Sequence, residues 1–136
     1  MKQVPQVQKY MTTLPHTIGK DIPIKTALSV MREHRIRHLP VQDGGKLIGI
    51  LTDRDLKLAS SFAESADLTT EEVMTPDPYT VAPDAPLDRV VLEMAEHKYG
   101  SAIIQQGNGK VVGIFTAVDG LRVLGELLES FYKQRP

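Results

Sequence analysis

The sequence predicts an α+β fold made of two tandem β-α-β-β-α repeats, whose halves pack about a pseudo-two-fold axis. Residues 49–55 (GILTDRD) recur as residues 113–119 (GIFTAVD), and each copy follows an apolar run and leads into a helical pattern. The pair Met11-Thr12 recurs 63 positions later as Met74-Thr75, and the offset becomes 64 after one residue is inserted in the hairpin. Only two copies occur, so the pattern indicates a duplicated subdomain rather than a solenoid.

Hydrophobic periodicity predicts the elements of the first repeat. Residues 6–11 form a short lead-in helix, and an extended piece follows near Thr17-Ile18. Asp21 is the expected N-cap of the next helix, with Pro23 in its first turn. Strands at 38–42 and 46–51 flank a tight-turn signal at residues 43–45, and a second helix runs from about residue 53 to 62. The first helix has one apolar face, with residues at i, i+3, i+4 and i+7: Ile24, Ala27, Leu28 and Met31.

The second repeat shows the same order of elements. Its first helix carries Val90, Val91 and Met94, its hairpin turns at residues 107–109, and its last helix extends to about Tyr132. The segment between the repeats is acidic and polar. We therefore divide the chain into a first repeat at residues 7–62, a linker at 63–72 and a second repeat at 73–132, which together form one globular module.

Composition limits the classes of function. The 136 residues are 41% hydrophobic and 24% charged, which is ordinary for a globular protein. A net charge of −1 argues against a general nucleic-acid or membrane-surface binder. The chain has no cysteine, which excludes disulfides, thiolate metal sites and cysteine nucleophiles. No apolar run approaches ~18 residues and the first residues lack a signal-peptide core, so we expect a cytoplasmic protein.

The recurring Thr-x-x-Asp segment has two interpretations. A threonine and an aspartate at a helix start can satisfy each other's backbone donors, as in a capping box. The same position also offers a hydroxyl, a carboxylate and free backbone N–H groups, which a phosphate and the hydroxyls of a sugar could use. Capping and ligand binding can coexist at the same residues, so the sequence leaves both open.

The order of elements and the repeated motifs resemble a tandem pair of cystathionine β-synthase (CBS) domains, called a Bateman module. The resemblance covers about residues 7–132, and it is carried by the Met-Thr openings, the run His38-Leu39-Pro40-Val41 and the segment 50–55 (ILTDRD). In this family the two copies pack their sheets together and leave two clefts, which often hold adenosine-containing ligands. The resemblance therefore implies a regulatory module that binds an adenine nucleotide and requires no cofactor.

Carried over residue by residue, the resemblance implies that Asp55 and Asp119 accept hydrogen bonds from the ribose hydroxyls. Thr52 and Thr116 contact ribose or phosphate. The adenine base lies between an extended piece in each repeat and the strand that follows the first helix. The residues of these walls are Thr17, Ile18, Ile36, Arg37, His38, Leu39 and Pro40 in the first repeat, and Thr80, Val81, Tyr99, Gly100, Ser101, Ala102 and Ile103 in the second.

The two repeats differ where a phosphate would be bound. At the positions concerned, the second repeat has Lys98, Gly100, Ser101 and Val118. The first repeat has four cationic or imidazole side chains there: Arg35, Arg37, His38 and Arg54. His34 and Arg35 also fit a simpler interpretation, because cations are favourable at a helix C-terminus. Arg37, His38 and Arg54 fit it less well, so the first repeat is the expected phosphate contact.

Motifs for catalysis and for metal binding are absent. There is no Gly-x-Ser-x-Gly, Walker or Gly-x-Gly-x-x-Gly pattern, and the histidines lack regular ligand spacing. His34 and His97 are repeat equivalents at helix ends, which favours structural roles.

We expect a non-enzymatic sensor of AMP, ADP or ATP, with AMP preferred, that signals occupancy to an unknown regulated protein. S-adenosylmethionine is the alternative ligand, and a dimerisation module with non-functional clefts is the alternative function. The apolar helix faces around Leu28 and Met31, and around Val91 and Met94, predict a homodimer.

Overall fold

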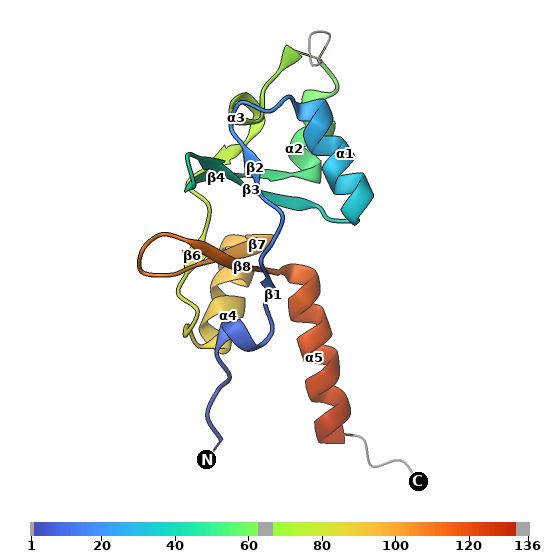
Figure 1. The fold of residues 1–136 in the computed structure, drawn as a ribbon. Helices are drawn as coiled ribbons and strands as arrows, with labels where there is room; N and C mark the ends of the chain where they lie inside the picture. The colour runs from blue at the N-terminus through green and yellow to red at the C-terminus, as the bar shows by residue number, and fades with distance from the viewer. Residues whose placement is uncertain (1, 63–66, 133–136) are drawn as a thin grey trace. The chain divides into compact units, whose positions relative to one another are not determined.

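The computed structural model describes residues 2–62 and 67–132, which fall into two compact units. The repeat-1 unit contains residues 15–62, 67–78 and 107–111, and the repeat-2 unit contains residues 2–14, 79–106 and 112–132. Each unit combines a four-stranded sheet with helices (Figure 1), so the predicted α+β fold of two repeats is confirmed. Within the described residues, no helix has the length and the apolar character needed to cross a membrane.

The repeat-1 sheet has the order β2-β3-β4-β5. Its strands are β2 (Ile18–Gly19), β3 (His38–Asp43), β4 (Lys46–Thr52) and β5 (Thr75–Pro76); β2 runs parallel to β3 and the other neighbours are antiparallel. The helices are α1 (Ile24–His34), α2 (Asp53–Ala59) and α3 (Thr70–Val73). Buried strand residues such as Leu39 and Leu51 pack against Met31 of α1 and Leu56 of α2, which forms the core of this unit.

The repeat-2 sheet has the order β1-β8-β7-β6. Its strands are β1 (Thr12–Thr13), β6 (Thr80–Val81), β7 (Ser101–Gln105) and β8 (Val111–Thr116). The 3-10 helix η1 (Val7–Lys9) and helices α4 (Leu87–His97) and α5 (Ala117–Tyr132) complete the unit. Val7, Val90, Met94 and Phe115 belong to its buried core, so the lead-in segment at the start of the chain packs with the second repeat.

The edge strands β1 and β5 were not predicted. Each begins at the threonine of one Met-Thr pair and closes the sheet of the other repeat, with Thr13 opposite Gly113 and Pro76 opposite Gly49. A Cβ atom on Gly49 would collide with the Met74 sulfur and lie 2.9 Å from the Thr75 carbonyl oxygen, and one on Gly113 would collide with the Met11 sulfur. The two recurring anchors, Met-Thr and glycine, are therefore the two sides of one packing contact that occurs in both units.

The first helix of the first repeat begins later than predicted, and Asp21 is not its N-cap. Pro23 occupies the N-cap position of α1 in an extended conformation, with no side-chain hydrogen bond. The Ile24 N–H donates to the Leu68 carbonyl at 3.1 Å, and in α4 the Leu87 N–H donates to the Pro5 carbonyl at 2.9 Å. A backbone carbonyl from a distant segment thus satisfies a first-turn donor at each of these two helix starts.

The segment expected to be a linker is partly structured. Residues 63–66 lie outside the described residues, but Thr70 in α3 is fully buried and its hydroxyl donates to the Ile22 carbonyl at 2.7 Å. Lys20, just after β2, lies 3.4 Å from Asp43 and 3.6 Å from Glu71 of α3. The hydrogen bond to Asp43 and the two carboxylate charges raise the pKa of Lys20. These contacts join α3 to the sheet of the first repeat.

Candidate ligand site and helix grooves

The Thr-x-x-Asp segment of the first repeat forms a reciprocal capping box at the start of α2. The Thr52 hydroxyl accepts the Asp55 N–H at 3.0 Å, and the Asp55 Oδ2 accepts the Thr52 N–H at 3.0 Å. The Thr75 hydroxyl approaches the same oxygen at 3.5 Å, from β5. The capping interpretation is confirmed, and it uses one carboxylate oxygen. Among the described residues, the other oxygen of Asp55 has no hydrogen-bond partner.

The second repeat has the same cap with one addition. The Asp119 Oδ2 accepts the Thr116 N–H at 2.9 Å, and the Thr116 hydroxyl accepts the Asp119 N–H at 3.2 Å. The remaining oxygen, Oδ1, lies 3.2 Å from the Arg122 guanidinium. The Arg122 side chain is 65% exposed, whereas that of Asp119 is 13% exposed. A ligand at Asp119 therefore has to displace an exposed arginine that has no counterpart at Asp55.

These helix starts offer fewer free N–H groups than the sequence suggested. In addition to the Thr52 and Asp55 amides used by the cap, the Asp53 N–H donates to the Arg37 carbonyl at 3.0 Å. The equivalent Ala117 N–H donates to the Gly100 carbonyl at 2.9 Å. Within the part of the chain that the structure describes, the Arg54 amide is the first-turn donor of α2 left without a partner. An anion at this helix start therefore needs a side-chain donor as well.

The strands place the other predicted residues of the first repeat around this cap. His38, the first residue of β3, pairs with Thr52 at the end of β4. Ile18 in β2 pairs with Val41, which sets the exposed Thr17 beside the Pro40 end of β3. Leu39 is fully buried in the core, so it supports the site rather than faces a ligand. Thr17, His38, Thr52 and Asp55 thus gather at one end of the repeat-1 sheet.

The second repeat brings aromatic rings to the matching position. Tyr79, just before β6, stacks on Tyr99 with ring centroids 5.0 Å apart, and Tyr99 stacks on His97 at 5.2 Å. Desolvation, the Glu93 carboxylate and Tyr99 raise the pKa of Tyr79. Tyr99 is among the site residues predicted from the sequence, whereas Tyr79 is not, although Tyr79 directly precedes the predicted Thr80. Ser101 and Ala102 are buried, Thr80 is exposed, and Val81 is half-buried.

The cations of the first repeat do not all line the same groove. Arg35 takes the left-handed conformation (φ 54°) that ends α1, and the equivalent Lys98 (φ 59°) ends α4 in the same way. The N–H groups of Arg35 and Ile36 both donate to the Met31 carbonyl, as in a Schellman-type end. Arg37 lines a groove between α1 and α2, whereas Arg54 lies in the first turn of α2 beside Asp55 and does not line that groove.

Histidines and acids do not form a convincing metal site in the described part of the chain. His16 stacks on His34 at 3.8 Å, and His97 pairs with Glu93 along α4 at 3.2 Å. Glu93, Glu96 and His97 could bring three ligand atoms together, but the group lies on the surface of one helix, where acidic clusters are common without an ion. The two repeat-equivalent histidines therefore have structural contacts at helix ends.

Comparison with known proteins identifies the fold. The CBS domain model matches residues 7–61 and 71–126. The chain belongs to the CBS domain family. It is a tandem CBS pair, and it is 34% identical to the CBS domain-containing protein YhcV of Bacillus subtilis over 83% of this chain and 81% of YhcV.

Solved CBS pairs share the fold over nearly the whole chain. AcuB of Vibrio cholerae is 32% identical, with a TM-score of 0.84 that covers 98% of this chain and 99% of AcuB. The CBS pair of MJ0100, solved in complex with 5′-methylthioadenosine and S-adenosyl-L-methionine, is 30% identical, with a TM-score of 0.82 over 91% of this chain and 98% of MJ0100's.

Other relatives are CBS regions of enzymes. The chain is 33% identical to inosine-5′-monophosphate dehydrogenase of Korarchaeum cryptofilum and to L-aspartate semialdehyde sulfurtransferase of Methanocaldococcus jannaschii, and it spans 24% and 23% of their lengths.

Each CBS repeat has a groove between its two main helices. The groove between α1 and α2 has a volume of about 570 Å³, and the one between α4 and α5 about 660 Å³. Eight pairs of lining residues are equivalent by the repeat offset, and Met31 with Met94 is one of them. The chemistry differs at four pairs, each polar in the first repeat and apolar in the second: Arg32 and Ala95, Asp53 and Ala117, Lys57 and Leu121, Ser60 and Leu124.

Proposed function

We propose that this CBS pair is a regulatory module that binds an adenosine-containing ligand, preferably AMP, and signals its occupancy to a partner protein. The observation that carries the proposal is the capped aspartate at the start of α2, which retains one carboxylate oxygen without a partner among the described residues. An ionised carboxylate accepts hydrogen bonds from the two hydroxyls of a ribose. The adenosine class is supported by the MJ0100 CBS pair, which holds two such ligands.

Phosphate preference is the finer part of the proposal. Arg54 is exposed in the first turn of α2, next to Asp55 and to its own free amide, and it has Val118 at the equivalent position of the second repeat. The helix start favours an anion through its dipole, and the guanidinium adds paired donors. Arg37 and His38 lie at the start of the opposite wall of the proposed ligand site. The first repeat therefore supplies most of the discrimination between AMP and adenosine.

S-adenosylmethionine is the second candidate ligand, because the MJ0100 pair was solved with it. Its sulfonium is cationic, so the arginines of the first repeat would not favour it. Calorimetric titration with AMP, adenosine and S-adenosylmethionine separates these possibilities. A thermal-shift panel with the same compounds tests the class as a whole, since a ligand at 100 times its dissociation constant adds about 2.7 kcal/mol of stability. Equal affinity for adenosine and AMP would refute the phosphate preference.

The proposed function involves no chemical step on the ligand. The proposed partner is a protein whose activity changes when the ligand binds to this module. We further propose that the module acts as a homodimer, since both repeats expose apolar residues on or next to their helices: Leu58 on α2 and Phe62 just after it, and Leu121 and Leu124 on α5. Light scattering in the absence and presence of AMP tests this part independently.

A further inference from the structure

The capped aspartates of the two repeats use their carboxylate oxygens differently. In the second repeat, Oδ2 of Asp119 accepts both the Thr116 N–H at 2.9 Å and the Thr116 hydroxyl at 3.1 Å. The oxygen left for a ligand is Oδ1, and it lies 3.2 Å from the Arg122 guanidinium. In the first repeat the cap likewise uses Oδ2 of Asp55, but Oδ1 has no partner within residues 2–62 and 67–132.

This difference follows from which acid forms an ion pair at the start of each last helix. In α2, Lys57 pairs with Asp53 at 3.1 Å, so the cation is held away from the capped aspartate. The residue three positions after that aspartate is Leu58, which is 67% exposed and cannot pair with it. In α5 apolar residues replace the first-repeat pair, and Arg122 pairs instead with Asp119, three positions before it. The ion pair has thus moved onto the site acid in the second repeat.

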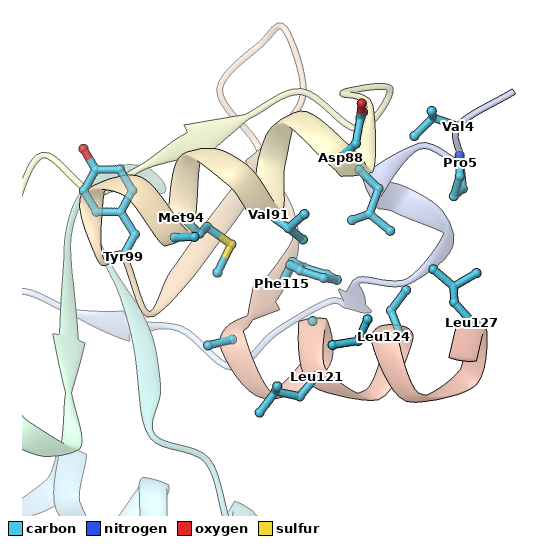
Figure 2. Close-up of a pocket in the computed structure, with 15 residues that line it drawn as sticks. Val4, Pro5, Asp88, Val91, Met94, Tyr99, Phe115, Leu121, Leu124 and Leu127 are labelled. Carbon is cyan, nitrogen blue, oxygen red and sulfur yellow. The ribbon is translucent and has the colours of Figure 1, made fainter. Parts of the chain in front are cut away.

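The Asp119–Arg122 pair lies outside the groove between α4 and α5. Figure 2 shows Leu121 and Leu124 of α5 facing α4 across this groove, and neither Asp119 nor Arg122 is among its lining residues. The Arg122 side chain is 65% exposed, and its one ion pair with a described residue is the pair with Asp119. The guanidinium can therefore leave Oδ1 without disturbing the core, at the small cost of an exposed ion pair.

From these contacts we infer that Arg122 is a built-in competitor for the ribose at the second repeat, so that the two repeats fill at different ligand concentrations. The inference rests on the proposed function, because it takes the capped aspartates as the ribose acceptors. A ribose that reaches Asp119 has to replace a guanidinium by two neutral hydroxyls, whereas no described side chain has to leave Asp55. The first repeat therefore fills first, and the second responds at higher ligand concentration.

Exchanging the residues at positions 58 and 122 tests the competition. Arg122→Leu gives the second repeat the residue of the first, and Leu58→Arg makes the opposite change. Adenosine is the probe, because it lacks the phosphate that a guanidinium would attract. We expect Arg122→Leu to raise adenosine affinity at the second site about two- to fivefold, and Leu58→Arg to lower it at the first by a similar factor, as befits an exposed ion pair. Calorimetry measures the second site in an Asp55→Asn background and the first in an Asp119→Asn background.

Two further variants show whether the charge of Arg122 is responsible. Arg122→Lys keeps a cation at this position and should restore most of the difference between the two sites. Arg89→Leu removes an exposed arginine from α4 and should change neither site. Circular dichroism checks that every variant is folded. A higher affinity in Arg89→Leu equal to that in Arg122→Leu would mean that net charge, rather than the pair with Asp119, sets the second site, which overturns the inference.

Salt dependence distinguishes competition from a purely structural role. Raising the ionic strength from about 0.1 M to about 1 M shortens the Debye length from ~10 Å to ~3 Å and so weakens the Asp119–Arg122 pair. Adenosine binding at the second site should strengthen with salt in the wild type and lose this dependence in Arg122→Leu. The first site should acquire the same dependence in Leu58→Arg.

The possible failures can be told apart. An Arg122→Leu variant whose second site keeps the wild-type affinity and salt dependence overturns the inference, while its adenosine binding leaves the proposed function in place. If neither site of the wild type binds adenosine or AMP, the proposed function is refuted and the inference with it.

Discussion

The two CBS repeats keep the same cap, the same Met–glycine contact and the same left-handed helix end, but they differ in the groove between their helices. Positions 32, 53, 57 and 60 carry polar side chains in the first repeat, and their equivalents are alanines and leucines in the second. The conserved contacts all hold backbone in place, whereas the grooves face solvent. The comparison teaches that duplication here preserved the frame of the unit and left the outward faces free to take different roles.

The proposed ligand sites of the two repeats also share their helix caps and differ in the side chains around them. Asp55 and Asp119 make equivalent caps, but Asp119 also holds an exposed arginine and the second repeat brings a tyrosine pair to its site. Arg54 has no cationic counterpart in the second repeat. The first repeat is thus the basic half of the module, and the second is the apolar and aromatic half.

The largest effect is expected from the capped aspartates. In Asp55→Asn the amide oxygen can still accept the Thr52 N–H, so the cap is kept while the second acceptor and the charge are lost. AMP binding should weaken by about 1.5–3 kcal/mol, the value for a hydrogen bond to a charged group. Asp119→Asn should weaken it less, because Arg122 already occupies that carboxylate. Calorimetry gives both values, and unfolding curves check that the cap is intact.

Equal losses at the two aspartates, or none, would contradict this asymmetry. A normal AMP affinity in both variants would mean that the Thr-x-x-Asp segments are helix caps and nothing more. A stability loss in Asp55→Asn of the size expected for a broken cap, about 1 kcal/mol, would show that the amide does not reproduce it. The affinity should then be measured at a temperature where the variant is fully folded.

The next-largest effect is expected at the two glycines, Gly49 and Gly113, that pack against the edge strands. Gly49→Ala places a methyl group against both the Met74 sulfur and the Thr75 carbonyl, whereas the three atoms nearest to a methyl group at Gly113 all belong to the Met11 side chain. A methionine end can turn aside, whereas a strand carbonyl cannot. We expect Gly49→Ala to lower the free energy of unfolding by about 1–3 kcal/mol, the usual cost of overpacking, and Gly113→Ala by less. Denaturant unfolding at fixed protein concentration measures both.

Shortening the methionine provides the control for this pair. Met11→Ala combined with Gly113→Ala removes the collision, so the two changes should cost less together than the sum of their separate costs. Met74→Ala should rescue Gly49→Ala only in part, because the Thr75 carbonyl remains. Full rescue at position 49 would mean that β5 shifts freely, which would contradict its role as a fixed edge of the first sheet.

The repeat, the hairpins and the capped segments could be predicted because each has a local signature: a periodicity, a glycine turn or a Thr-x-x-Asp spacing. The two-residue strands β1 and β5 have no periodicity, and their partners lie in the other repeat, so in the sequence Met11 and Gly113 look like separate anchors. The start of α1 was misplaced for a similar reason, since its donor is satisfied by the Leu68 carbonyl rather than by Asp21. Charge could be counted from the sequence, but only the fold placed Arg37 in a groove that Arg54 does not line.

The separation of the arginines gives the third prediction. If Arg54 contacts the phosphate, Arg54→Ala should reduce the preference for AMP over adenosine by about 1 kcal/mol or less, since exposed ion pairs are screened. Arg37→Ala should have a smaller effect if its side chain stays in the α1–α2 groove, and the double variant should bring AMP close to adenosine. Arg32→Ala, from the same groove, is the matched control. Affinity for adenosine should not change in any of them, and added salt should weaken the preference.

The last prediction concerns the left-handed helix ends, where the two repeats should behave alike. Arg35 and Lys98 hold φ values of 54° and 59°, which cost a side chain with a Cβ atom free energy that glycine avoids. Replacing either by alanine removes the cation at the helix C-terminus, worth about 0.3–1 kcal/mol, and keeps the strain. Replacing it by glycine removes both. The glycine variant should therefore be more stable than the alanine variant by about 1 kcal/mol at position 35 and equally at position 98. Denaturant midpoints with unchanged slopes measure the difference, and AMP affinity should not follow it, because neither residue is placed at the ribose or the phosphate. A difference at one end only would show that the two helix ends are not equivalent in solution, and that the divergence of the repeats reaches the backbone as well as their outward faces.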